Sequence, residues 1–271
     1  MSMLRLLVAY DGTDFAGYQI QPDQRTVQGV LEDALTQLTN GQTVRVRGAG
    51  RTDAGVHALG QVVSIDSSDL DAETVMSAMP SLLPHDVSVL DVQPALGDFD
   101  ARRSARLRSY VYLLWCHEAP HPLYRKYSLW VKDPVDVQLL NSELASIMGT
   151  HDFTSFARLR PEQSPFRTIS EAHAISASPF VRIHVSGNAF LHQQVRSIVG
   201  TALEVASGRR DAGLTQRALE ARDRSAAGVV AAPEGLTLTD VAYDGITWPL
   251  RPQIAWPWSD LCMSAETRWS A

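Results

Sequence analysis

The feature that most limits the possible folds of this chain is the order in which strand-like and helix-like spacings of apolar residues follow one another. Residues 3–10 form a short apolar run that ends in a turn at Asp11, as buried strands do. After Thr26, a plausible N-cap, apolar residues recur with helical spacing for three turns. Extended patterns near 44–47 and 61–66, a helical pattern at 71–83 and an extended one at 87–94 follow. This β-α-β-β-α-β order predicts an α+β sandwich, with helices packed on one face of an antiparallel sheet.

A second set of patterns starts after Asp100. It comprises a strand at 106–115, a helix started by Asp136, strands at 168–177 and 180–186, helices at 191–207 and 215–222, and a last strand at 236–241. Since no long linker separates the sets, we predict two similar domains that share a surface, at residues 1–102 and 103–245. A tail at 246–271, rich in tryptophan and proline, either wraps on the body or binds a partner.

Composition excludes several classes of protein. Only two of the 271 residues are cysteines, Cys116 and Cys262, so a disulfide framework is excluded and we expect a cytoplasmic protein. The early apolar run is too short to span a membrane or to act as a secretory signal. The net charge of −6 gives no reason to expect a polyanionic partner, but residues 101–130 hold six basic side chains against Glu118 alone.

A glycine-rich loop at residues 48–58 carries the most unusual chemistry. Small residues surround Arg51 and Asp53, so a ligand can approach the backbone closely while both charged side chains project beside it. The glycine spacing matches neither the dinucleotide nor the phosphate-loop pattern, and we therefore predict no nucleotide cofactor. Asp53 is either a catalytic carboxylate or the cap of a turn, and its spacing leaves both interpretations open.

Two further patterns concern arginine. On the strand at 106–115, a period of two places four side chains on one face: Arg106, Arg108, Tyr110 and Tyr112. Such a face suits the binding of phosphates and the stacking of an unpaired base, but it is equally compatible with an amphipathic strand whose tyrosines pack under loops. On the helix at 191–207, Arg196 borders the apolar stripe, where it either meets an anionic partner or lies along the core.

The sequence predicts no metal site. His117, Glu118 and His121 match a metalloprotease pattern that requires a helix, but Pro120 and Pro122 prevent one. The remaining histidines are scattered and no cysteines cluster.

Taken together, these segments resemble the TruA family of tRNA pseudouridine synthases. The resemblance covers about residues 3–245, and its most specific part is the loop from Gly50 through Asp53 to Ala58. Six other segments match in order: 10–19, 26–29, 99–102, 149–153, 190–192 with 195–196, and 234–236. Tyr18 replaces the usual tryptophan, Gln193 and Gln194 replace Asn-Met, and Thr237 replaces a common aromatic residue.

The resemblance implies a role for five side chains. Asp53 matches the nucleophile, Arg196 its partner, Tyr110 the ring that stacks on the target uracil, Leu236 an apolar wall beside that base, and Arg51 a side chain near the flipped nucleotide. The implied fold is two RRM-like, ferredoxin-like halves that form one long antiparallel sheet with a central RNA-binding cleft. The implied protein is a homodimer without cofactors that modifies uridines 38 to 40 of the tRNA anticodon stem-loop.

Two other functions are compatible with the residues. A non-catalytic RRM-type RNA-binding protein would need only the arginine and tyrosine face, with Arg106 and Arg108 on phosphates. A hydrolase of glycosidic bonds would need a second carboxylate near Asp53, for which Asp11, Asp14 and Asp100 are candidates.

Overall fold

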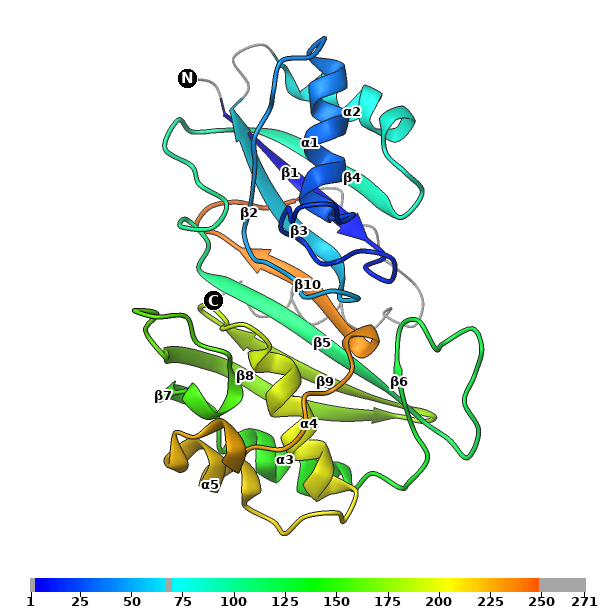
Figure 1. Cartoon of the computed structure of the whole chain (residues 1–271), viewed down its shortest axis with the longest axis vertical. Coiled ribbons are helices and arrows are strands. Elements are labelled where there is room, and N and C mark those ends of the chain that lie inside the picture. The colour runs from blue at the N-terminus through cyan, green and yellow to red at the C-terminus, as the bar shows by residue number, and fades with distance from the viewer. Residues whose placement is uncertain (1–2, 67–69, 249–271) are drawn as a thin grey trace.

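A single large sheet forms the centre of the molecule (Figure 1). The computed structural model describes residues 3–66 and 70–248, and within them ten strands follow the order β4-β1-β3-β10-β5-β9-β8-β7, with β2 beside β3 and β6 beside β5. The strands are β1 (Met3–Tyr10), β2 (Val46–Gly48), β3 (His57–Asp66), β4 (Val87–Ala95), β5 (Leu107–Cys116), β6 (Leu129–Val131), β7 (Gly149–Asp152), β8 (Phe166–Ala177), β9 (Phe180–Gly187) and β10 (Leu236–Ala242). The predicted α+β fold with a large, mostly antiparallel sheet is confirmed.

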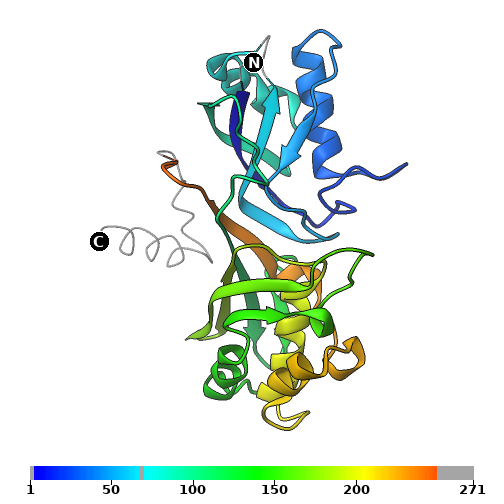
Figure 2. The same ribbon diagram turned by 90° about the vertical axis from the view of Figure 1, so that its left-hand side faces the viewer.

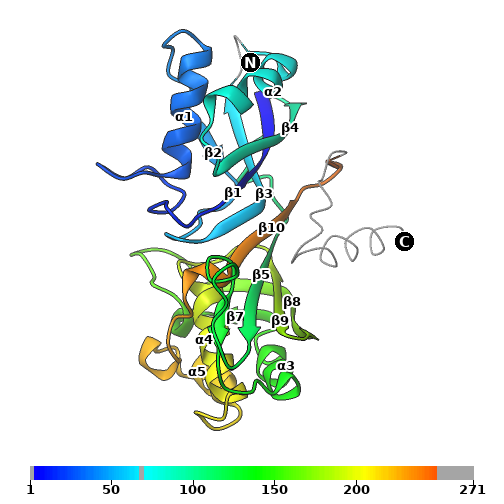
Figure 3. The same ribbon diagram turned by 90° about the vertical axis from the view of Figure 1, so that its right-hand side faces the viewer.

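Five α-helices occur in the described residues: α1 (Val27–Leu38), α2 (Ala72–Leu82), α3 (Val137–Ala145), α4 (Gln194–Ala206) and α5 (Leu214–Ala221). The side chain of Thr26 accepts a hydrogen bond from the Gly29 amide, and Asp136 accepts from the amides of Gln138 and Leu139, so both predicted N-caps are confirmed. The β-α-β-β-α-β order of the first half is also confirmed. Helices α1 and α4 lie on the same side of the sheet, as the two side views show (Figures 2 and 3).

The last strand joins the two halves of the sheet. Strand β10 pairs antiparallel with β5 and, through Thr237 opposite His57 and Leu238 opposite Ala58, parallel with β3. The strands approach closely at Gly60, where an added Cβ would lie 2.4 Å from the Thr239 carbonyl oxygen. Strand β10 therefore lies in the middle of the sheet, between β3 and β5. Its pairing with β3 begins where the glycine-rich loop ends.

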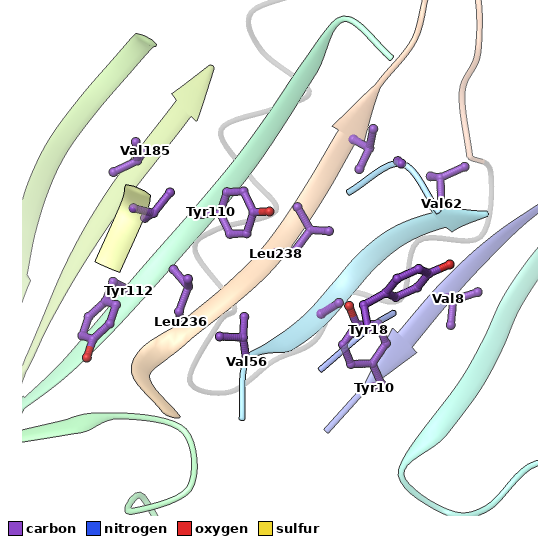
Figure 4. Packing of buried hydrophobic residues seen from close by; sticks show 14 of the residues in the cluster. Val8, Tyr10, Tyr18, Val56, Val62, Tyr110, Tyr112, Val185, Leu236 and Leu238 are labelled. Atoms are coloured by element: carbon purple, nitrogen blue, oxygen red, sulfur yellow. The ribbon is translucent and has the colours of Figure 1, made fainter. Parts of the chain in front are cut away.

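The two faces of β5 distinguish between the two interpretations of this strand. Tyr110 and Tyr112 belong to the main hydrophobic core, whereas Val111 and Leu113 form a smaller cluster on the opposite face. Figure 4 shows both tyrosines with Leu236 and Leu238 of the neighbouring strand. The tyrosines are 8% and 0% exposed. The structure therefore favours the amphipathic strand with packed tyrosines over an open face that alternates cations and rings.

The tail predicted at 246–271 lies outside the described residues beyond Trp248. Trp248 itself is buried, and the Arg5 guanidinium lies 5.7 Å from its ring centroid. No helix in the described part of the chain has the length and apolar character needed to cross a membrane.

Candidate active site

The loop that carries Asp53 is held rigidly between β2 and β3. An added Cβ on Gly12 would lie 2.0 Å from the Val56 carbonyl oxygen, so only glycine fits under the loop there. The Tyr18 amide donates to the Thr52 carbonyl at 3.0 Å. The fully buried side chain of Gln61 donates to the Gly50 carbonyl and accepts from the Gly50 amide. These contacts fix the backbone on both sides of Asp53 and define the direction of its side chain.

Asp53 and Arg196 form an ion pair, although 142 residues lie between them in the chain. The Arg196 Nη1 donates to Asp53 Oδ2 at 2.9 Å, and the two side chains are only 12% and 17% exposed. The Arg196 Nε donates to the Ala231 carbonyl at 2.7 Å, which fixes the plane of the guanidinium. This charge-assisted hydrogen bond fixes the direction of the carboxylate. The structure thus brings together the two residues that the resemblance paired.

His192 also reaches the carboxylate, a contact that sequence reasoning missed. Its Nε2 lies 3.4 Å from Asp53 Oδ1, on the oxygen that Arg196 leaves free. Its side chain is 52% exposed, and Gln193, which follows, adopts a left-handed backbone conformation with φ of 63° at the start of α4. The spacing of four residues between His192 and Arg196 could have indicated this contact, because residues four apart at a helix start lie on the same face.

Tyr110 lies at the wall of the same site. Its ring contacts the edge of Phe190 with centroids 5.2 Å apart, and a Cβ on Gly50 would lie 3.7 Å from its hydroxyl oxygen. Burial raises the pKa of the Tyr110 phenol above its usual value, and the nearby Asp53 charge adds to that rise. The phenol is therefore neutral at physiological pH. Leu236 precedes the β10 residues that pair with β3 and is 5% exposed; Figure 4 shows it between Tyr110 and Val56.

Arg108 is not an open phosphate-binding side chain, in contrast to the expectation from its strand. It is 7% exposed, and both terminal nitrogens donate to backbone carbonyls, those of Ala49, Arg102, Ala105 and Asn188. All four N–H groups on these two nitrogens are thereby used. Burial lowers the pKa of the Arg108 guanidinium. Arg108 holds together the loop before Asp53, the turn after β4 and the segment before α4.

Arg106 is exposed and lies just before β5. Its Nε donates to Asp244 at 2.8 Å, and both side chains are at least 70% exposed. It does not line the cleft at Asp53, and its contact with RNA stays a prediction. Tyr112 is the remaining member of the predicted face. Its hydroxyl donates to the Ala232 carbonyl at 2.7 Å and so holds the segment that leads into β10 from within the core.

Asp53 lies in a cleft of about 1110 Å³. Residues from both halves of the chain line it, among them Arg51, Tyr110 and Leu236. Within the described residues, eight arginines line the cleft against three carboxylates: Arg47, Arg51, Arg102, Arg103, Arg108, Arg160, Arg167 and Arg196 against Asp53, Asp100 and Glu162. The cleft is therefore strongly basic although the chain as a whole is acidic, and such a cleft attracts a polyanion.

The described residues contain no group of three side chains suited to hold a metal ion. His117 and His121 lie in a loop, as their prolines predict, and their rings pack on Trp115. The site offers a carboxylate, a guanidinium, an imidazole, a phenol and an apolar wall, which suits acid–base or nucleophilic chemistry on a planar ring.

Comparison with known proteins places this cleft in a family. A family model described as tRNA pseudouridine synthase matches residues 6–102 and 144–244. The chain belongs to the family of tRNA pseudouridine synthases. It is 44% identical over 243 residues to tRNA pseudouridine synthase A of Latilactobacillus sakei, covering 88% of this chain and 98% of that protein. It is 44% identical over 248 residues to the protein of the same name from Lacticaseibacillus casei, covering 90% and 100% of the two chains. The family predicted from the sequence is confirmed.

The matched segments contain most of the site. Asp53, Arg196 and Leu236 lie inside them, whereas Tyr110 and Arg108 on β5 lie in the interval between them. The family model therefore covers both walls of the cleft but not the central strand that carries Tyr110.

Proposed function

We propose that this protein converts uridine to pseudouridine in tRNA and that Asp53 is the nucleophile. The observation that supports the proposal most is the Asp53 carboxylate, paired with Arg196 at 2.9 Å inside a basic cleft. Relatives 44% identical over nearly the whole chain are named tRNA pseudouridine synthase A, and this agrees with the proposal.

The reaction breaks the N1–C1′ bond of a uridine, turns the base and rejoins it through C5, while the C5 proton leaves and N1 takes up a proton. Atoms balance without an oxidant or a second substrate. The Asp53 carboxylate adds to the substrate when the glycosidic bond breaks, either at C1′ of the ribose or at C6 of the base, and it is released when the C5 bond forms. Arg196 aims the carboxylate through the hydrogen bond that its Nη1 donates to Asp53 Oδ2.

The base must leave its stack to reach Asp53. Flipping costs a few kcal/mol, and stacking on an aromatic ring returns about 1–3 kcal/mol. Tyr110 supplies this ring and Leu236 the apolar wall, so the detached uracil is retained while it turns. The neutral Tyr110 phenol is available to hydrogen-bond a base oxygen and to help move the C5 proton. Arg51, on the Asp53 loop, lies near the flipped nucleotide.

The finer assignments follow from the family resemblance. The target is the anticodon stem-loop, at uridines 38 to 40, and the enzyme works in the cytoplasm as a homodimer. Residues 1–102 and 103–245 act as two RRM-like halves whose junction forms the cleft. Mass-spectrometric mapping of tRNA modified by the purified protein tests the positions, and sedimentation analysis tests the dimer.

A hydrolase of glycosidic bonds is not favoured. Asp11 hydrogen-bonds Thr13 and Tyr127 and does not line the cleft, nor does the exposed Asp14. Asp100 does line it, but although burial opposes ionisation, hydrogen bonds from the Arg103 and Arg102 amides lower the net pKa of Asp100. An ionised carboxylate cannot serve as the general acid that such a hydrolase needs. Release of free uracil during turnover would show instead that the protein is a hydrolase.

The test is the Asp53→Asn variant on an anticodon stem-loop labelled with tritium at C5 of its uridines. The amide keeps the shape of the side chain but not its charge. We expect tritium release to fall below detection while tRNA binding stays within about threefold of wild type. Asp14→Asn, exposed and outside the cleft, should release tritium at the wild-type rate. Turnover by Asp53→Asn would refute the nucleophile, and binding without turnover by the wild type would indicate a non-catalytic RNA-binding protein.

A further inference from the structure

The cleft arginines divide into two groups according to their partners. Four already have a partner within the protein. Arg47 and Arg103 both pair with Asp100, at 3.5 and 3.4 Å. Arg196 pairs with Asp53, and Arg108 donates to four backbone carbonyls. These four therefore have a structural or catalytic partner already.

The other four carry a charge that no described carboxylate neutralises, although Arg167 also donates from Nη1 to the carbonyls of Ser164 and Phe166. Within the described residues, Arg51, Arg102, Arg160 and Arg167 form no ion pair, and Glu162, the nearest acidic residue in sequence to Arg160, pairs with none of them. Arg51 and Arg102 belong to the first half of the chain and Arg160 and Arg167 to the second. The same cleft thus has two unneutralised guanidinium groups on each wall.

The four charges also act on one another. Partial burial lowers the pKa of Arg51, and the charges of Arg102 and Arg160 lower it further. Partial burial likewise lowers the pKa of Arg167, and Arg102 adds to the effect. Arg102 is therefore close to cations on both walls. Like charges held together without a carboxylate destabilise the empty cleft, and an anion between them relieves the repulsion.

The backbone that carries these arginines is fixed. The Asp100 side chain accepts from the Arg102 amide at 3.0 Å, and Arg108 donates to the Arg102 carbonyl at 2.6 Å. On the other wall, the Arg158 amide donates to the His192 carbonyl at 3.3 Å, which ties the loop of Arg160 to the Asp53 site. Arg167 donates to the Ser164 carbonyl at 2.9 Å. The cluster is thus a preformed set of donors.

We propose that Arg51, Arg102, Arg160 and Arg167 form a clamp for successive phosphodiesters of one RNA strand, beside the nucleotide that enters the Asp53 site. The inference rests on the proposed function and assigns the phosphate contacts to this clamp, in place of Arg106 and Arg108. A guanidinium presents its donors as a fork that matches a phosphate, and two walls that share one strand fix its register in the cleft. Register determines which uridine reaches Asp53.

The experiment measures the salt dependence of stem-loop binding in the Asp53→Asn background, so that the RNA is not converted. Each phosphate contact contributes about 0.7–0.9 to the slope of log K against log salt concentration. Arg102→Gln with Arg160→Gln should reduce the slope by about 1.5 and weaken binding at 0.1 M salt at least tenfold. Both side chains are exposed, and their circular dichroism melting curves should match the parent.

Arg103→Gln is the matched control. It lies in the same cleft and next to Arg102, but its guanidinium already pairs with Asp100, which it shares with Arg47, so its slope should change by less than about 0.4. Equal slope changes for Arg103→Gln and for either clamp arginine would overturn the clamp, as would an unchanged slope in the double variant.

Single neutral methylphosphonate linkages in the stem-loop identify the phosphates. At the linkages beside the target nucleotide, the substitution should weaken binding to the Asp53→Asn parent but not to the double variant. Equal losses in both proteins at every linkage would contradict the clamp. Failure of the proposed function has a separate signature, because wild type would then release no tritium while the slopes still distinguish Arg102 and Arg160 from Arg103.

Discussion

Replacement of Arg108 by methionine tests whether this buried cation is a structural centre or a phosphate ligand. Its side chain donates to the carbonyls of Ala49, Arg102, Ala105 and Asn188, which lie in three separate segments around the cleft. Methionine keeps the length of the apolar stem and removes every donor. The substitution therefore isolates the four hydrogen bonds from the packing of the chain.

The size of the effect follows from the surroundings of the four carbonyls. The bond to Ala49 is buried, and an unsatisfied buried acceptor costs about 1–3 kcal/mol. The other three are partly buried, so water can replace the guanidinium, and each should lose about 0.5–1.5 kcal/mol. We expect the free energy of unfolding of Arg108→Met to fall by roughly 3–6 kcal/mol. The kcat should fall at least tenfold, because Ala49 leads directly into the Asp53 loop.

Urea unfolding followed by circular dichroism gives the free energy, with the slope of the transition as a check that both proteins unfold in the same manner. The control is Arg106→Met, two residues away, which removes only an exposed ion pair and should cost about 0–1 kcal/mol. Equal stability of the two variants would refute the network. So would a stable Arg108→Met whose only defect is a lower salt slope of tRNA binding, since that is the signature of a phosphate contact.

Two further predictions concern the support of the Asp53 loop. Gly12→Ala would place a methyl carbon 2.0 Å from the Val56 carbonyl oxygen, so the loop must shift; we expect a loss of about 1–3 kcal/mol of stability and a fall in kcat. Gly41→Ala has no atom within 4 Å of the added carbon but a φ of 96° that strains alanine, so it should lower stability and keep the wild-type kcat. Asp11 has a lowered pKa, because hydrogen bonds from Thr13 and Tyr127 and the His57 charge outweigh the opposing effect of burial. The ionised Asp11 side chain therefore stabilises the fold above pH 3.8, the ordinary pKa of aspartate, and this stabilisation is lost as the pH falls through the lower pKa of the folded protein. The difference in the free energy of unfolding between wild type and Asp11→Asn, from urea titrations at pH 2 to 6, should shrink on acidification. A difference that grows would contradict the assignment.

Local patterns predicted the elements well where one face is strongly apolar. The start of α1 follows from Thr26 and the apolar spacing behind it, and the start of α3 from Asp136. The position of Arg196 at the border of the α4 stripe was also informative, since its side chain is 12% exposed and turned toward an anion. Strands β6 and β7 were not predicted, because three and four residues are too few to show an alternation of apolar and polar side chains.

Long-range contacts explain the rest. A period of two identifies the two faces of β5 but not which face the helices cover, and tyrosine suits both a core and an open surface. The burial of Arg108 depends on carbonyls at positions 49, 102 and 188, which no local pattern reveals. The resemblance named Asp53 and Arg196 together, but only the fold gives their distance and adds His192 to the carboxylate.

The junction of β3 and β10 explains how residues from two halves form one site. His57, where the parallel pairing starts, follows Asp53 by four residues, and its partner Thr237 follows Leu236 by one. Pairing at this point therefore sets Leu236 against the Asp53 loop directly through the backbone. The ion pair is set by a second route, because Arg196 Nε donates to Ala231 in the segment that leads into β10. The same segment thus fixes both the apolar wall and the guanidinium against the carboxylate. A parallel pairing of only two residue pairs suffices, because hydrogen bonds and ion pairs on either side of it act on the same loop.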